Sequence, residues 1–179
     1  MRRVMKWKSS ESGLNTGFLK GYEEMKKVMF VCWGNICRSP MAEFVFKKMV
    51  EERHLSGMFD AASCAISSEE IWNGRGNPVY PPARRILAEH GISCEGKRAV
   101  QIRREDYARY DYIVAMEQHH IRHMQRLFGG DPEGKLSLLM DYTGHPRAVA
   151  DPWYTDDFET AYRDIEEGCA ALLEYLVRK

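Results

Sequence analysis

The residues with the clearest chemical potential are Cys32 and Arg38, which are separated by five residues. A short apolar run at 25–31 precedes them and a helical apolar stripe follows, so the pair lies between a predicted strand and a predicted helix. A loop that curls into a helix N-terminus points several backbone N–H groups at a bound anion. Arg38 adds a planar fork that matches two phosphate oxygens. The spacing therefore predicts a phosphate-binding loop with a thiol at its centre.

The same donors favour the thiolate form of Cys32, which is the form that attacks phosphorus. Ser39 is placed to donate a hydrogen bond to the sulfur and to stabilise it again when it leaves a phosphocysteine intermediate. Gly34 lets the loop turn tightly, and side-chain hydrogen bonds of Asn35 are expected to hold it. The predicted loop comprises seven residues: Trp33, Gly34, Asn35, Ile36, Cys37, Arg38 and Ser39.

Segment 31–43 resembles the signature of the low-molecular-weight protein tyrosine phosphatases. The Cys-x5-Arg spacing also marks other phosphatase families, whereas Gly-Asn-Ile-Cys-Arg-Ser-Pro directly after an N-terminal strand is far more specific. Further segments similar to family landmarks follow in order: Trp72 with Gly74, and residues 90–92, 110–116 and 151–154. The resemblance extends over roughly residues 25–178 and implies a metal-independent, cofactor-free hydrolysis of phosphotyrosine through a phosphocysteine.

The resemblance also implies a general acid in the Asp-Pro-aromatic segment, which is Asp151. Departure of a tyrosine oxygen is helped by a proton, and a phosphate dianion nearby favours the protonated form of the acid. Pro152 restricts Asp151 to extended backbone conformations, which helps to fix its carboxyl group. We therefore expect an activity optimum on the acid side of neutral pH.

Aromatic residues are expected to form walls around the phenyl ring of a substrate. Deep walls would let phosphotyrosine reach Cys32 while phosphoserine falls short. The predicted walls are Trp33, Trp72, Trp153 and Tyr154. For Cys37, the resemblance implies a reversible disulfide with Cys32 that protects the nucleophile from over-oxidation; the alternative is a small buried side chain.

Two positions depart from the family pattern. Many members have a His near Lys97 that supports the loop Asn, so the support of Asn35 is an open question, and Glu117 stands where Asp is common. Three histidines also lie close together without a Cys or Glu at metal-site spacing, so we interpret them as a solvated face and predict no metal site. They are His119, His120 and His123.

Three other functions fit parts of this pattern. Arsenate reductases of the same fold pass a disulfide through two further cysteines close together, whereas Cys64 and Cys94 are far apart in the chain. Protein-arginine phosphatases carry Thr in place of Ile36 and lack the bulky aromatic residues of the acid loop. A non-catalytic phosphate-binding module needs neither a thiol nor an acid. The sequence thus favours phosphotyrosine proteins and small aryl phosphates as substrates, with inorganic phosphate as product or inhibitor.

The elements that must position these groups alternate between strands and helices. Strand patterns cover residues 25–31, 58–66, 111–116 and 135–140. Helical patterns cover residues 41–53, 82–90, a segment ending near 128, and a last helix capped by Thr155 or Asp157. Alternation predicts an α/β fold: a single-domain, doubly wound, Rossmann-like or flavodoxin-like four-stranded parallel sheet flanked by helices on both faces. Cys32 then lies at the switch point where such sheets bind ligands.

Composition excludes several other classes. The 179 residues fit one domain, and 26 acidic against 26 basic residues offer no electrostatic case for nucleic acid or an anionic membrane. No apolar run approaches the ~20 residues that span a bilayer. Five cysteines without a repeated spacing argue against a secreted disulfide framework, so we expect a cytoplasmic protein, with a monomer as the simplest state. Residues 1–24 are expected to be a disordered leader or extension before a phosphatase domain at 25–179.

Overall fold

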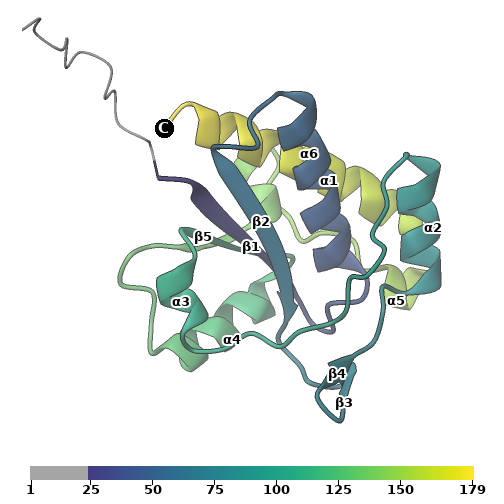
Figure 1. The fold of residues 1–179 in the computed structure, drawn as a ribbon. Helices are drawn as coiled ribbons and strands as arrows, with labels where there is room; N and C mark the ends of the chain where they lie inside the picture. The colour runs from purple at the N-terminus through teal and green to yellow at the C-terminus, as the bar shows by residue number, and fades with distance from the viewer. Residues whose placement is uncertain (1–23) are drawn as a thin grey trace, which may run out of the picture.

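A four-stranded sheet lies at the centre of the computed structural model, which describes residues 24–179 (Figure 1). Its strands are β1 (Lys26–Cys32), β2 (Phe59–Ala65), β5 (Tyr112–Ala115) and β6 (Leu136–Leu138). All neighbours pair in parallel, in the order β2-β1-β5-β6. The chain moves from β1 to β2 and then crosses to β5 on the other side of β1. The predicted parallel sheet is confirmed, and Cys32 ends β1 at its switch point.

Helices cover both faces of the sheet (Figure 1). One face carries α1 (Arg38–Glu52), α2 (Pro81–Glu89) and α6 (Phe158–Val177), and the other carries α3 (Asp106–Arg109) and α4 (Gln118–Phe128). Strand β1 is buried on both sides, which explains its unbroken apolar run. Val28 and Phe30 belong to the core cluster under α1 and α6, whereas Met29 and Val31 belong to the cluster under α4.

Several elements differ from the sequence prediction. The strand predicted at 135–140 ends at Leu138, because the Asp141 carboxylate accepts a hydrogen bond from the Leu138 backbone at 3.1 Å and closes a 3-10 turn, Leu139–Tyr142. The last helix is capped by Asp157, whose carboxylate accepts from the Thr160 backbone at 2.9 Å. Two very short helices were not predicted, α3 and α5 (Pro152–Thr155).

A hairpin of two short strands, β3 (Ile71–Trp72) and β4 (Arg75–Gly76), was also not predicted. Its turn residues, Asn73 and Gly74, both have positive φ, 48° and 75°. Asn-Gly between two strands is the strongest short-range hairpin signal, because both central residues of this turn must adopt left-handed conformations. That dipeptide is the sequence signal that could have located the hairpin, which projects from the body of the domain (Figure 1).

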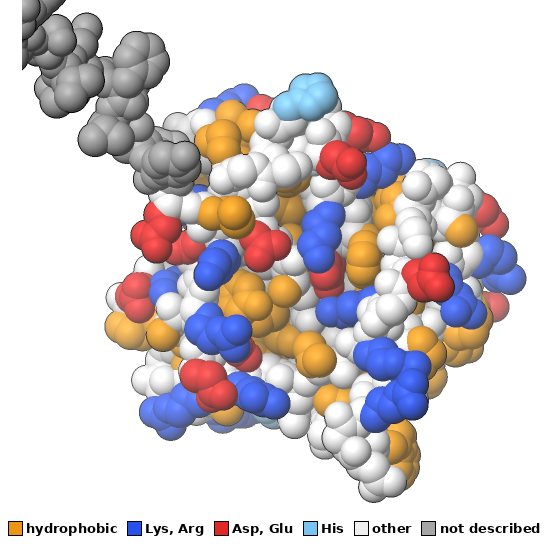
Figure 2. All heavy atoms as spheres, viewed as in Figure 1, with side chains coloured by type: hydrophobic (Ala, Val, Ile, Leu, Met, Phe, Trp, Pro, Cys, Tyr) orange, Lys and Arg blue, Asp and Glu red, His pale blue; other side chains and the backbone are white. Residues whose placement is uncertain are grey.

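The surface carries both signs of charge. Figure 2 shows acidic and basic side chains interspersed over the face in view. Among the helices of residues 24–179, none combines the length and apolarity needed to cross a bilayer. The predicted leader at 1–24 lies, apart from Glu24, outside the described residues.

Candidate active site

Cys32 stands where β1 ends, and residues 33–37 lead from it into α1. Its side chain is 3% exposed. The sulfur lies 3.0 Å from Ser39 Oγ and accepts the backbone N–H of Asn35 at 3.3 Å. Among the described residues, no side chain caps the N-terminus of α1, so its first backbone N–H groups remain available to an anion. The arrangement gives the thiol a ring of donors.

Asn35 holds this loop through its side chain and its backbone. Its Nδ2 donates to Ser39 Oγ and Ser63 Oγ, both at 2.9 Å, and its Oδ1 accepts from the Val100 backbone at 3.1 Å. Its φ of 57° lies in the left-handed region, which Asn tolerates better than most residues. Because Ser39 Oγ accepts from Asn35, its one hydroxyl hydrogen can be donated to the Cys32 sulfur at 3.0 Å or to the Cys64 carbonyl at 3.4 Å.

Lys97 and Glu43 provide the support of Asn35 that was open from the sequence. Lys97 Nζ lies 2.8 Å from Glu43 Oε2 and donates to the Ser63 carbonyl at 3.0 Å. Ser63 Oγ donates to the same Glu43 oxygen at 2.6 Å, which leaves its own lone pairs to accept from Asn35. A continuous series of contacts thus joins the Lys97 ammonium to the loop.

Glu43 is 4% exposed, which makes its charge state dependent on its partners. Burial alone would raise the pKa of its carboxyl group. The charge of Lys97, with hydrogen bonds from Lys47, Lys97 and Ser63, outweighs burial and holds that pKa below its ordinary value. Sequence reasoning missed both Glu43 and Ser63. A Ser inside a buried strand and a Glu in the first turns of the signature helix were the available signals.

Arg38 is buried between two carboxylates. Its Nη2 lies 2.8 Å from Glu117 Oε1 and 2.7 Å from Asp151 Oδ2, and its Nη1 donates to the Val149 carbonyl at 3.4 Å. Glu117 follows β5 and Asp151 precedes α5, so three distant segments meet at one guanidinium. The structure therefore brings the predicted acid to the predicted loop.

Asp151 also organises the segment that follows it. The backbone is extended, as expected before Pro152, and Oδ1 accepts the Trp153 N–H at 3.1 Å as the N-cap of α5. The preceding Ala150 N–H donates to the Asp164 carboxylate of α6 at 2.9 Å. These bonds hold the backbone on both sides of Asp151.

A cavity of about 550 Å³ connects the loop, the carboxylates and the aromatic side chains. Trp33, Trp153 and Tyr154 line it and are 40%, 61% and 85% exposed, so their rings are free to contact a substrate. Trp72 is not among its lining residues and lies 70% exposed in the hairpin. The structure thus brings three of the four predicted walls together and leaves Trp72 outside.

Two acidic residues before the hairpin line the cavity in its place. They are Glu69 and Glu70, and Glu69 Oε2 accepts the Trp33 indole N–H at 3.0 Å. They were missed because nothing in the sequence marks the approach of segment 67–70 to the loop.

All five cysteines are free and buried. Cys37 lines the cavity with Cys32. Burial, reinforced by the negative charge of a Cys32 thiolate, raises the pKa of Cys37 to about 12, which keeps it a thiol near neutral pH. Cys64 and Cys94 are 1% and 4% exposed, so neither thiol is accessible to a reductant in solution, as the arsenate-reductase relay would require.

The interpretation of the three histidines as a solvated face is wrong for His120, whereas His119 is exposed and His123 is half-buried. His120 is fully buried, and the rings of His119 and His123 pack against Trp33, with centroids 5.9 Å and 6.4 Å away. His120 lies on the side of α4 that also buries Ile121 and Met124, which is why only this histidine is enclosed. Burial, with the nearby positive charge of other side chains, lowers the pKa of His120 to about 3.

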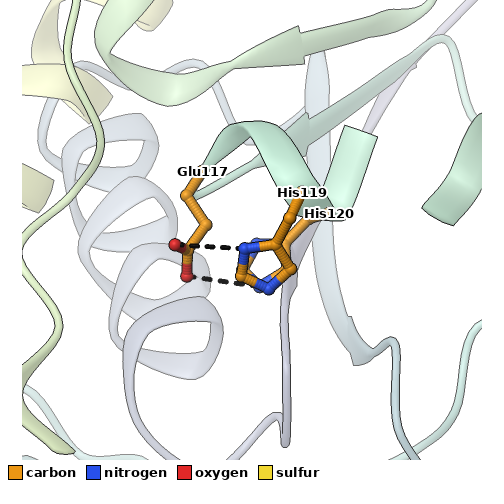
Figure 3. Close-up of side chains that lie close together, drawn as sticks. All are labelled: Glu117, His119 and His120. Atoms are coloured by element: carbon orange, nitrogen blue, oxygen red, sulfur yellow. Dashed lines mark ion pairs between the residues drawn. The ribbon is translucent and has the colours of Figure 1, made fainter. Parts of the chain in front are cut away.

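Glu117 is the partner that the spacing argument missed. Its Oε2 lies 3.2 Å from Nδ1 of His119 and its Oε1 lies 3.5 Å from Nε2 of His120 (Figure 3). Glu117 is the residue before α4 and has extended backbone, which turns its carboxylate back over the first turn of the helix. The search for metal ligands at helical spacings considered only residues within the helix, so it did not include Glu117.

Comparisons with known proteins agree with this geometry. A family model described as "Low molecular weight phosphotyrosine protein phosphatase" matches residues 27–179. The chain is similar to low molecular weight protein-tyrosine-phosphatase YfkJ of Bacillus subtilis, with 37% identity over 83% of this chain and 94% of the relative. It is also similar to the human low molecular weight phosphotyrosine protein phosphatase, with 38% identity over 83% and 94%.

Solved structures show the same likeness. The crystal structure of YfkJ from Bacillus subtilis matches with a TM-score of 0.83 and 35% identity, over 88% of this chain and 98% of that chain. Vibrio vulnificus Wzb in complex with benzylphosphonate matches with a TM-score of 0.73 and 27% identity, over 85% and 99%.

Proposed function

The chain belongs to the low-molecular-weight protein tyrosine phosphatases, and from this premise we propose that Cys32, Arg38 and Asp151 carry out the hydrolysis. The observation that supports these roles is their convergence on one cavity: the Cys32 sulfur at its loop, and Asp151 Oδ2 2.7 Å from the Arg38 guanidinium. The acid comes from a segment more than a hundred residues after the loop that carries the thiol and the cation, and a phosphate-binding module needs only the cation.

In the first step, the loop N–H groups and Arg38 hold the phosphate while the Cys32 thiolate attacks phosphorus. The sulfur–phosphorus bond forms as the bond from phosphorus to the aryl oxygen breaks. The protonated Asp151 gives its proton to that oxygen, so a neutral phenol leaves. The product is a phosphocysteine on Cys32.

In the second step, a water molecule attacks the phosphorus of the phosphocysteine. The Asp151 carboxylate takes one proton from this water, and the sulfur–phosphorus bond breaks. Ser39, 3.0 Å from the sulfur, stabilises the departing thiolate, and inorganic phosphate is released. The site returns to its starting protonation state.

The substrate we propose is phosphotyrosine in proteins, together with small aryl phosphates. Trp33, Trp153 and Tyr154 offer exposed rings around the cavity. The similar Wzb of Vibrio vulnificus was solved with benzylphosphonate, a phenyl ring joined to a phosphate-like group, which supports an aryl phosphate here. Ile36 lines the same cavity, where a protein-arginine phosphatase would carry Thr.

The nucleophile is tested with p-nitrophenyl phosphate in the presence of a chelator. We expect wild-type turnover to be insensitive to the chelator and the Cys32→Ser variant to be inactive, because a serine hydroxyl is not ionised near neutral pH. Cys94→Ser is the matched control, since Cys94 is buried away from the cavity. Turnover by Cys32→Ser at the wild-type rate would exclude the phosphocysteine mechanism.

For Cys37 we propose the redox role, with a disulfide to Cys32 after oxidation of the nucleophile. Its position in the same cavity and its protonated thiol support a resolving rather than a competing role. After a peroxide pulse, wild-type activity should return on addition of a thiol reductant, whereas Cys37→Ser should recover a smaller fraction. Equal recovery would assign Cys37 to packing. Five free thiols also support a reducing, cytoplasmic location.

A further inference from the structure

The groups that the phosphatase reaction does not use are gathered at the start of α4. Glu117, His119 and His120 present ligand atoms that all lie within 4.8 Å of one another (Figure 3). We propose that these three residues bind a zinc ion, and that zinc bound there reversibly inhibits the phosphatase.

The spacing of the ligand atoms suits tetrahedral zinc. Zinc binds imidazole nitrogen and carboxylate oxygen at about 2.0–2.1 Å, which places neighbouring ligand atoms about 3.3 Å apart. The His119 Nδ1 atom lies 3.2 Å from Glu117 Oε2, and the His120 Nε2 atom lies 3.5 Å from the other carboxylate oxygen, Oε1. Both separations are close to that value, so a zinc ion between the two rings can be reached by an oxygen of Glu117. Two imidazoles and one carboxylate favour zinc over magnesium, which prefers oxygen ligands.

His120 gives an independent reason to expect a ligand. Its side chain is fully buried, and within residues 24–179 neither ring nitrogen has a hydrogen-bond partner. A buried polar group without a partner costs about 1–3 kcal/mol, so such groups are rare. Its Nε2 faces the Glu117 carboxylate, and a zinc ion between them would satisfy this nitrogen.

Binding at this position is coupled to the phosphate site through Glu117. The oxygen that faces His120, Oε1, lies 2.8 Å from Arg38 Nη2, so zinc and Arg38 compete for it. Asp151 remains beside Arg38 when Glu117 leaves, so the guanidinium keeps a partner but loses its orientation between two carboxylates. His119 also lines the cavity and packs against Trp33, so zinc would affect an aromatic wall as well.

The partial positive charge at the N-terminus of α4 opposes a cation there. Binding is therefore expected to be weaker than at a structural zinc site, as suits a reversible inhibitor. Three protein ligands leave a fourth position open, as in other zinc sites that exchange their ligands.

Zinc binding is tested by calorimetry on the Cys32→Ser protein, so that the nucleophilic thiol cannot be the ligand. We expect one zinc ion per chain. His119→Gln and His120→Gln, each added to Cys32→Ser, should weaken binding by about 10-fold or more. His123→Gln is the matched control, because His123 packs on the same Trp33 ring but is not one of the three ligands. His119 is 44% exposed, so its variant is expected to fold even if the buried His120 variant does not.

Inhibition is then measured with p-nitrophenyl phosphate as the zinc concentration that halves the activity of each variant with Cys32 intact. The proposal expects this concentration to rise by about 10-fold or more in His119→Gln and to stay unchanged in His123→Gln. Unchanged zinc affinity in His119→Gln, or no binding by Cys32→Ser, would overturn it. The inhibition rests on the proposed function, whereas calorimetry on Cys32→Ser does not, so the two failures are distinguishable.

Discussion

Asp151 has two contacts that a single substitution can separate. One carboxylate oxygen caps α5 by accepting the Trp153 N–H at 3.1 Å, and the other lies 2.7 Å from Arg38. An Asn at this position keeps an oxygen for the cap but has no acidic proton and no charge. The cap, and with it the position of the Trp153 wall, can therefore be retained while the acid is removed.

For Asp151→Asn we expect phosphotyrosine hydrolysis to slow by about 10²–10⁴-fold, the usual contribution of a general acid. Hydrolysis of p-nitrophenyl phosphate should fall much less, because p-nitrophenolate leaves without a proton. The measurement is kcat for both substrates under the same conditions. Asp151→Ala serves as the comparison, since it also removes the cap. Equal losses for the two substrates in Asp151→Asn would assign the residue to structure alone.

At the scale of elements, the position of the acid depends on how closely α6 packs against the 3-10 turn Leu139–Tyr142. Gly168 lies in the middle of α6, and a Cβ there would stand 2.6 Å from Leu139 Cγ and 3.1 Å from Met140 Sδ. Glycine therefore permits this close approach. The same helix carries Asp164, which accepts the Ala150 N–H just before the acid, so a displacement of α6 would reach the active site.

For Gly168→Ala we expect a net destabilisation of about 1 kcal/mol, because overpacking costs ~1–3 kcal/mol and better helix propensity returns ~1 kcal/mol. Urea unfolding measures the change. In a Leu139→Ala background, which makes room for the new methyl group, the same substitution should be neutral or stabilising. If the Gly168→Ala single variant were more stable than wild type, α6 would be able to move away from Leu139 with no loss in the free energy of unfolding, and the close-packing explanation would be wrong.

At the scale of the whole molecule, one buried ion pair connects segments from across the fold to the loop. Glu43 comes from α1, Ser63 from β2 and Lys97 from the segment after α2, and together they reach Asn35. The Lys97 and Glu43 side chains are 13% and 6% exposed. Removing Lys97 therefore leaves a buried carboxylate whose remaining cation is the more exposed Lys47, 2.6 Å away. Stability and loop geometry should therefore change together.

For Lys97→Met we expect a loss of about 3 kcal/mol in the free energy of unfolding at pH 7, with a lower kcat. The folded-state pKa of Glu43 lies below its ordinary value of 4.5, so the pair stabilises the protein above that pH. This contribution is lost as pH falls through the folded-state pKa, so the difference between wild type and variant should shrink in acid. Urea unfolding at neutral and acid pH measures it.

Two controls accompany that variant. Lys97→Arg keeps the charge and should retain most of the stability, whereas adding Glu43→Gln to Lys97→Met should recover part of the loss by removing a buried carboxylate that keeps only Lys47 as its cation. A stability difference that is the same at both pH values would show that the pair is not the cause.

The sequence alone determined the groups whose interactions are local. One tight loop joins Cys32 to Arg38 at the N-terminus of the following helix. The number of residues between them is therefore enough to predict how the two side chains lie relative to each other. Residues 151–152 likewise determine their own extended backbone, because Pro152 restricts the residue before it, and they include the proposed acid. The alternation of apolar strands and amphipathic helices determined the parallel sheet, because each face must be buried, and hence the position of Cys32 at the switch point.

Only the tertiary structure decided what surrounds these groups. The contacts of Lys97 with Glu43, of Glu117 with Arg38 and His120, and the distance of Trp72 from the cavity all depend on packing between segments distant in the chain. No local sequence pattern predicts these contacts. A charged or aromatic residue has the same letter in the sequence whether its side chain faces solvent or packs against a neighbouring element. For this reason His120 looked solvated in the sequence and is fully buried in the fold.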